Sequence, residues 1–421
     1  MISATSRRLA LPAATWTLLA AWGAFCFLYG LRNSGEAWHF FVQGGHLFTQ
    51  GGPKGGLHLY ATAPQLQIGP LALAVGAALL PFGTAGSMLA AQILAMMCGA
   101  LVLVLVRDIA RLRPEATAGR TAATQMRVFA LAAALFLPTW AYMAVFSVHL
   151  DDALALTFGV VGVHLCVTGR AAWAGLSLGL AVDAKPWALP FARIVLILPG
   201  IRAKGIAVAA LAGAVAVGWL PFLLADPQTM KALHFTIRTT GMSALHELGV
   251  TAPRTPWWDR SAQGALGLLV GTLAVRNRRW ALVILAPVAV RLVLDPGTNR
   301  YYLAGLLTGT LLWDVAGRRS RWPYWTIAGF VGLFVLRWAP MPAAYHGWLT
   351  LVYTAAVVFA AVVPGLPGPV AERLGLGPQP APAPAAGAVR RGNARQLAGE
   401  PGQGQAGGRF RRVLGQAAPG E

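Results

Sequence analysis

Charged residues are scarce in this chain. Asp, Glu, Lys and Arg together make up 11% of its 421 residues, whereas hydrophobic residues make up 56%. Because a soluble domain carries roughly 25% charged residues, this shortage excludes a water-soluble fold. Apolar runs close to the ~20 residues needed to cross a bilayer recur along the chain instead. The sequence therefore predicts an all-α integral membrane protein.

Cysteine is also scarce, and familiar nucleotide and metal motifs are missing. Cys26, Cys98 and Cys166 lie in apolar runs without the spacing of disulfides or metal sites. The chain contains no Gly-x-x-x-x-Gly-Lys-Ser/Thr loop and no His-Glu-x-x-His motif. These absences argue against a soluble nucleotide-binding domain.

What the chain has in excess is positive charge, with a net charge of +20. Its basic residues cluster in short segments between apolar runs. These are Arg7/Arg8, 107–127, Arg202/Lys204, 276–279, 318–321 and the C-terminal tail. Lys and Arg concentrate on cytoplasmic loops and favour anionic inner-leaflet lipid. We therefore expect a plasma-membrane protein with both termini cytoplasmic, whose basic segments meet membrane lipids and not nucleic acid.

Hydropathy predicts about twelve transmembrane helices within a domain of residues 1–363. The expected spans are 9–31, 86–106, 127–147, 151–168, 171–184, 187–199, 205–225, 262–275, 280–294, 301–316, 322–339 and 346–363. The short run 67–82 is bounded by prolines, and as a full span it would place the arginines of 107–127 outside. We therefore expect a re-entrant or juxtamembrane helix there, in the first outer loop. Residues 364–421 predict a disordered basic cytoplasmic tail.

The first outer segment, 32–66, carries one acid, Glu36. Trp38, Phe41 and Phe48 fall at helical spacing, which predicts an amphipathic helix at the membrane surface. Glu36 is either a solvated residue of an interfacial aromatic belt or a general base for a substrate hydroxyl. Beside it, His39 is a candidate substrate ligand. Further along, His58 and Tyr60 either line a sugar pocket or belong to a connector.

Two more ionisable clusters lie next to apolar runs. His149, Asp151 and Asp152 begin a span at its outer end, where acids either cap the helix or face a cavity and bind metal or sugar. Mg²⁺ or Mn²⁺ is a possible cofactor of such a pair, but no ligand spacing compels a metal site. Lys185 follows Asp183 in a turn. It either snorkels beside an interfacial Trp or acts as a point charge for a lipid-linked phosphate.

A short outer turn begins at Asp295 and combines an acid, an amide, a guanidinium and two phenols. Arg300 can bind phosphate oxygens bidentately, and Tyr301 and Tyr302 can stack on a sugar or anchor at the interface. The long segment 226–261 is long enough to cover a site.

These motifs together resemble the polytopic GT-C glycosyltransferases. Within that superfamily, the chain is most similar to the glycosyltransferase family 87 group of actinobacterial polyprenol-phosphate-mannose-dependent α-mannosyltransferases. The resemblance covers about residues 10–360. It rests on Glu36-Ala-Trp-His-Phe, Tyr60 with Pro64 and Gly69-Pro70, His149-Leu-Asp-Asp, the run Gly175 to Trp187, and the turn Asp295…Tyr301-Tyr302.

The resemblance implies transfer of a sugar from a polyprenyl-phosphate donor to a glycolipid or glycan acceptor on the outer face. It makes Glu36 the expected base, although the family normally has aspartate there, with Asp151 or Asp152 in reserve. By position, Lys185 and Arg300 are the expected ligands of the donor phosphate, and His149 is expected to orient one substrate. The alternatives are a multi-pass transporter or lipid flippase, and a non-catalytic membrane scaffold.

Overall fold

The structure, a computed structural model, describes residues 13–113 and 119–363. Arg7, Arg8 and the predicted tail 364–421 lie outside the described residues. Within the described ranges, every regular element is a helix, and an isolated bridge between Arg238 and Arg254 is the only β-type pairing. The prediction of an all-α protein is therefore confirmed.

In the described part of the chain, six helical segments are long and apolar enough to cross a membrane. They are α1 (Ala13–Gly30), α4 with α5 (Pro70–Leu112), α6 with a π-helical turn (Ala122–Phe146), α7 (Leu150–Val167), α9 (Gly200–Ala225) and α15 (Ala343–Val362). Five shorter apolar helical segments accompany them: α8 (Ala171–Ala184), the 3₁₀ helix η7 (Pro186–Ile197), Trp280–Leu294, α13 (Tyr302–Ala316) and Tyr324–Trp338. The chain is thus a helical protein of membrane-embedded character. The number of twelve spans stays a prediction.

The fold also contains further helices, and some of the segments above combine two elements. The other α-helices are α2 (Trp38–Thr49), α3 (Leu59–Thr62), α10 (Ala244–Glu247), α11 (Asp259–Arg276), α12 (Leu285–Leu294) and α14 (Tyr324–Gly329). Within the combined segments, α4 covers Pro70–Leu79, α5 covers Gly83–Leu112, and α6 covers Ala122–Ala141 before the π-helical turn Tyr142–Phe146. A second π-helical turn, Phe330–Val335, follows α14.

The predicted helix of the first outer segment is present as α2, but its apolar face packs on protein. Trp38 and Phe41 are 2% and 1% exposed. Gly44 and Gly45 let α2 approach α4, because an added Cβ at Gly44 would meet the Leu73 side chain at 2.6 Å. The amphipathic pattern of α2 therefore arises from burial against α4. Helix α4 is itself the short helix that we expected within the run 67–82.

Contacts between distant segments gather the loops at two opposite ends of the helices. At one end, Arg120 donates to the Asp314 carbonyl oxygen at 2.9 Å and Arg127 to that of Arg321 at 3.1 Å. The loops at this end contain the basic clusters 107–127 and 318–321.

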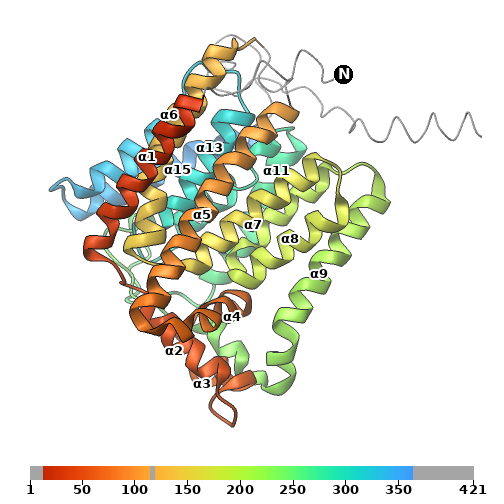
Figure 1. Ribbon diagram of the computed structural model, residues 1–421, viewed down its shortest axis with the longest axis vertical. Helices are drawn as coiled ribbons and strands as arrows, with labels where there is room; N and C mark the ends of the chain where they lie inside the picture. Colours follow the sequence, from red (N-terminus) through yellow and green to blue (C-terminus); the bar gives the residue numbers. More distant parts are fainter. Residues whose placement is uncertain (1–12, 114–118, 364–421) are drawn as a thin grey trace, which may run out of the picture. The chain divides into compact units, whose positions relative to one another are not determined.

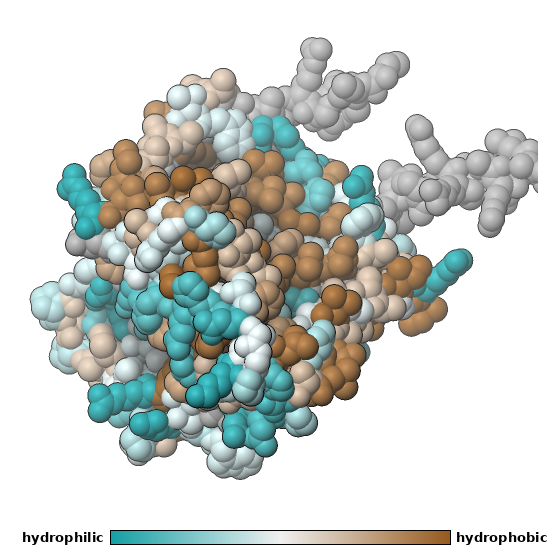
Figure 2. Space-filling view, turned by 60° about the horizontal axis from the view of Figure 1, so that its bottom comes forward, coloured by the Kyte–Doolittle hydropathy of each residue, from teal (hydrophilic) through white to brown (hydrophobic). Residues whose placement is uncertain are grey.

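At the other end, backbone hydrogen bonds join the segments that we expected on the outer face. The Ala37 amide donates to the Ser147 carbonyl at 3.0 Å, and the Thr240 amide to the Pro296 carbonyl at 3.0 Å. This end lies near the bottom of Figure 1, where α2, α3 and α4 are labelled. Figure 2 turns it forward and shows hydrophilic side chains gathered there, with hydrophobic side chains over much of the surface beyond.

Helices α8 and α9 pack closely through small residues. An added Cβ at Gly175 would clash with the Ala207 carbonyl oxygen, and one at Gly179 would lie 2.9 Å from the Leu211 carbonyl oxygen. Small residues spaced by four allow such close approach between membrane helices. Only Ala207 and Phe222 of α9 are buried, so most of this helix faces outward or toward the space described below.

Candidate functional site

The candidate site begins at a strained junction between α6 and α7. After the π-helical turn, Val148 has a φ of 55°, which is an outlier for a β-branched residue. The His149 amide donates to the Met143 carbonyl at 3.0 Å, and Val148 is 1% exposed, so packing holds this conformation. π-Helical turns and backbone strain both recur at functional sites. Here the π-helical turn and the strained Val148 place the first turn of α7, which carries Asp151 and Asp152, at the end of the helices where the polar loops gather.

The second contribution comes from the end of α8. Pro186 cannot continue the helix and pushes the residue before it into an extended conformation, which is what Lys185 adopts (φ −155°, ψ 114°). Its ammonium group forms an ion pair with Asp151 and lies 3.9 Å from Oδ2 of Asp152. Burial would lower the pKa of Lys185, but the adjacent Asp151 and Asp152 outweigh it and raise that pKa. Lys185 is therefore a cation whose charge is already balanced by the carboxylates of Asp151 and Asp152.

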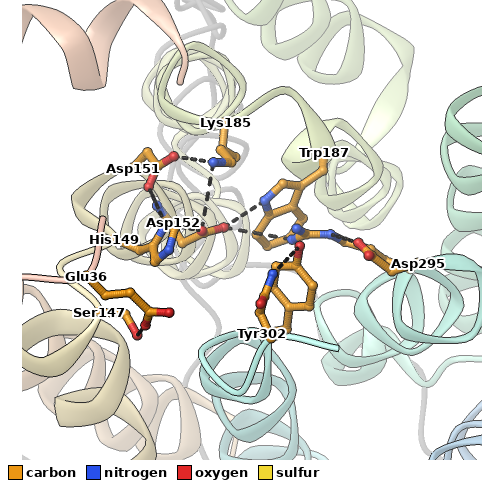
Figure 3. Close-up of polar contacts among 11 residues, drawn as sticks. Glu36, Ser147, His149, Asp151, Asp152, Lys185, Trp187, Asp295 and Tyr302 are labelled. Carbon is orange, nitrogen blue, oxygen red and sulfur yellow. Dashed lines mark hydrogen bonds and ion pairs between the residues drawn. The ribbon is translucent and has the colours of Figure 1, made fainter. Parts of the chain in front are cut away.

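Arg291, a residue that sequence analysis did not single out, lies at the centre of the site. Its guanidinium lies 3.8 Å from Asp152 and 3.8 Å from Asp295. It also lies over the rings of Trp187 and Tyr302, at 4.5 Å and 4.4 Å from their centroids. Trp187 Nε1 donates to Asp152 at 2.8 Å, which closes the network drawn in Figure 3. An arginine inside the apolar run Trp280–Leu294 was the missed signal, since charges within membrane segments usually mark function.

His149 is held by a ring on one side and by carboxylates on the other. It stacks on Tyr301 with 3.5 Å between ring centroids and 21° between planes. Its Nδ1 lies 3.5 Å from Asp151 Oδ1 and 3.6 Å from Asp152 Oδ2. A histidine oriented through one nitrogen keeps its other nitrogen for a substrate, which is the arrangement of a general base.

These residues open into a cavity of ≈ 800 Å³. Its polar lining includes His149, Asp151, Lys185, Arg291, Tyr301 and Tyr302. Apolar side chains line it along α9 (Val215, Trp219, Leu223) and η7 (Leu189, Pro190). Binding sites for small molecules commonly combine an apolar wall with a few convergent polar groups.

Two residues given central roles by the sequence lie beside this cavity and are not among the described residues that line it. Glu36 is exposed, and one of its oxygens accepts a hydrogen bond from Ser147 Oγ at 3.4 Å. Arg300 lies over the ring of Trp338, 3.6 Å from the centroid. The structure therefore brings together His149, Asp151, Asp152, Lys185, Tyr301 and Tyr302, and it leaves Glu36 and Arg300 outside the group.

The other predicted substrate ligands are dispersed. His39 is exposed beside Phe40. His58 pairs with Asp226 at 3.2 Å, which ties the first outer segment to the end of α9. Tyr60 donates to the Ile68 carbonyl at 2.8 Å and stacks on Trp219. Of these three, Tyr60 lines the cavity.

His149, Asp151 and Asp152 can also be read as a metal site. Each offers a ligand atom, and these atoms lie within 4.8 Å of one another. One imidazole and two carboxylates suit a divalent transition metal. However, Lys185 contacts both carboxylates, so a metal ion would have to displace its ammonium group.

The pentapeptide Gly175–Gly179 has the sequence Gly-Leu-Ser-Leu-Gly, which matches the Gly-x-Ser-x-Gly motif of a hydrolase nucleophile elbow. A functional elbow needs a sharp strand-to-helix turn that exposes the serine. Here Ser177 lies inside α8, and its Oγ donates to the Phe158 carbonyl at 2.8 Å. The pattern is therefore part of the α8–α9 packing and does not form a nucleophile.

Comparisons of the chain with protein-family models, with curated proteins and with solved structures found no match. The class of this protein is therefore described from its fold and its candidate site alone. Over the residues that the structure describes, it is an all-helical protein of membrane-embedded character with a network of buried acids and half-buried cations at one end of its helices.

Proposed function

We propose that the protein is a membrane glycosyltransferase. It would move a sugar, with mannose as the first candidate, from a polyprenyl-phosphate carrier to a hydroxyl acceptor on the outer face of the plasma membrane. One observation carries the proposal: a single cavity joins an apolar wall on α9 to fixed cations, the Asp151 carboxylate and a histidine. An anionic headgroup on a hydrocarbon chain needs both surfaces. The resemblance to family 87 of the GT-C enzymes supports the same reaction.

In this reaction, the acceptor hydroxyl oxygen bonds to the anomeric carbon while the bond from that carbon to the phosphate oxygen breaks. The proton of the hydroxyl passes to a base, and polyprenyl phosphate leaves with the electron pair. Fixed cations lower the barrier because negative charge develops on the leaving phosphate. We assign the base to His149, oriented by Asp151 and Asp152, because it lines the cavity. Glu36 is the alternative base.

The test is sugar transfer from a radiolabelled polyprenyl-phosphate sugar in membranes that contain the purified protein. We expect His149→Gln to lower the turnover rate at least 100-fold, as loss of a general base does. His46→Gln is the matched control, because His46 is an exposed histidine of α2 outside the cavity.

Three results would change the proposal. A loss of turnover in Glu36→Gln with full turnover in His149→Gln would move the base to Glu36. If neither substitution lowers turnover, the base assignment fails. If the native protein transfers no sugar from any prenyl-phosphate donor, the function fails.

A transporter or flippase is the second candidate. The observation in its favour is a chain of alternating charges in which buried acids meet half-buried cations: Asp151, Lys185, Asp152, Arg291 and Asp295. Ion pathways through membranes are built from such relays. Proteoliposomes with and without a proton gradient separate the two functions, because gradient-driven uptake without sugar transfer would favour transport.

A further inference from the structure

The cations that line the cavity are of two kinds. Lys185 and Arg291 each contact carboxylates, as described above. Arg238 and Arg260 line the same cavity, and neither forms an ion pair with a carboxylate in the described ranges. Their charges remain available to a ligand, whereas those of Lys185 and Arg291 are already compensated.

Local structure fixes the backbone at both arginines. Arg260 is half-buried in the first turn of α11. Arg238 is exposed and forms an isolated bridge with Arg254, and the Thr255 amide beside this bridge donates to the Ile237 carbonyl at 2.9 Å. Segment 237–240 is therefore tied to the segment that leads into α11 and also, through Thr240, to the turn before Tyr301.

The acids near Arg260 do not cancel its charge completely. Asp259 and Asp295 act on it electrostatically, and both are buried. Burial raises the pKa of Asp259 to about 7. Burial also raises the pKa of Asp295, against the opposing effect of Arg291. Asp259 is therefore only partly ionised near neutral pH, and it offsets less of the Arg260 charge than a solvated carboxylate would.

The apolar part of the cavity points to the other half of the ligand. Val215, Trp219 and Leu223 follow one another at intervals of four along α9, so they share a face of that helix. Leu189 and Pro190 of η7 line the same cavity. A hydrocarbon chain fits such a wall, whereas a small inorganic anion would leave it uncovered.

We propose that Arg238 and Arg260 form the receptor for a lipid phosphate, whose hydrocarbon chain lies along the Val215–Trp219–Leu223 face of α9. Lys185 and Arg291 then hold the carboxylates in place and do not bind the phosphate directly. This assignment differs from the expectation of Lys185 and Arg300. Only the identity of the lipid rests on the proposed function. The unpaired arginines and the apolar wall are features of the structure whatever reaction the protein catalyses.

The experiment is equilibrium binding of radiolabelled geranylgeranyl phosphate to the full chain in phosphatidylcholine nanodiscs. Geranylgeraniol, which has the same chain without the phosphate, is the matched ligand. The test variant is R238A/R260A. R238K/R260K keeps the charge, and K54A/K231A is the control, since both lysines are exposed and lie outside the cavity lining. Arg300→Ala tests the competing assignment, and size-exclusion profiles check that each variant folds.

We expect R238A/R260A to weaken phosphate binding at least tenfold, since hydrogen bonds to charged groups are worth more than neutral ones. Binding of the alcohol should change less than twofold in that variant. R238K/R260K should lose less than R238A/R260A, and K54A/K231A should match the native chain. Leu223→Glu should weaken both ligands, because it places a charge on the apolar wall.

Three results would overturn the inference: no binding of the phosphate probe by the native chain, equal loss of phosphate and alcohol in R238A/R260A, or loss in Arg300→Ala alone. The inference and the proposed function fail separately. Binding through Arg238 and Arg260 without sugar transfer would overturn the function alone. Sugar transfer with unchanged donor binding in R238A/R260A would overturn the receptor alone.

Discussion

The guanidinium of Arg291 lies 4.5 Å from the ring centroid of Trp187. The same indole donates its Nε1 hydrogen to Asp152, so Trp187 links a cation and a carboxylate that face each other at 3.8 Å. Cation–π contacts are strongest where water is excluded, and Arg291 is 11% exposed here. The two residues come from η7 and α12, so this contact joins distant parts of the chain at the site.

Replacing Arg291 should destabilise the protein. Arg291→Met leaves Asp152 and Asp295 without their guanidinium partner, and loss of one partner of a buried ion pair costs about 3–5 kcal/mol. We expect a clearly lower Tm in detergent. Arg291→Lys should fall between the native chain and Arg291→Met, because a lysine keeps the charge but lacks the planar group that stacks on Trp187 and Tyr302. A Tm equal to that of the native chain would mean that the network contributes no stability.

Removing Lys185 should create a metal site. Without its ammonium group, Asp151 and Asp152 keep His149 as their neighbour and can bind Mn²⁺ with it. We expect Lys185→Ala to bind Mn²⁺ at least tenfold more tightly than the native chain in isothermal titration calorimetry. The gain should disappear in Lys185→Ala/Asp151→Asn. Equal affinity in Lys185→Ala and the native chain would contradict this competition between lysine and metal.

The buried acid Asp259 should make stability depend on pH. Burial raises the pKa of its carboxyl to about 7, above the roughly 3.9 of an unfolded aspartate. Between these values the folded state binds more protons than the unfolded state, so this group lowers stability as pH rises toward 7. Asp259→Asn should therefore raise Tm most at pH 8 and least at pH 5. A constant difference between the two Tm curves would contradict the raised pKa.

Gly69 should not accept a side chain. Its amide donates to the Ala184 carbonyl at 3.1 Å, and an added Cβ would clash with the Asp183 carbonyl oxygen. Gly69→Ala should lower Tm and, because this contact adjoins Lys185, also reduce activity. Gly213→Ala is the matched control, since nothing lies near an added Cβ there and alanine favours a helix by roughly 0.5–1 kcal/mol. Similar Tm values for the two variants would show that α8 can move away from Gly69.

Local patterns predicted most of the helices but only part of the site. The run Leu150–Val167 and the break before Pro186 can be read directly from hydropathy and proline, and the structure has both. The spacing of Trp38 and Phe41 predicted α2, but not what it packs against. A stripe of apolar residues looks the same whether lipid or another helix covers it. For the same reason the count of spans stays a prediction.

The sequence by itself determined that this is a helical protein rich in apolar segments, with ionisable residues next to the helix ends. These properties depend on neighbours within a few residues of one another. Only the tertiary structure decided that Arg291 lies between Trp187 and Tyr302, that Arg238 and Arg260 line the cavity, and that Glu36 and Arg300 lie outside its lining. The rotation of each helix and the path of each loop set those positions, because they arise from packing between segments far apart in the chain.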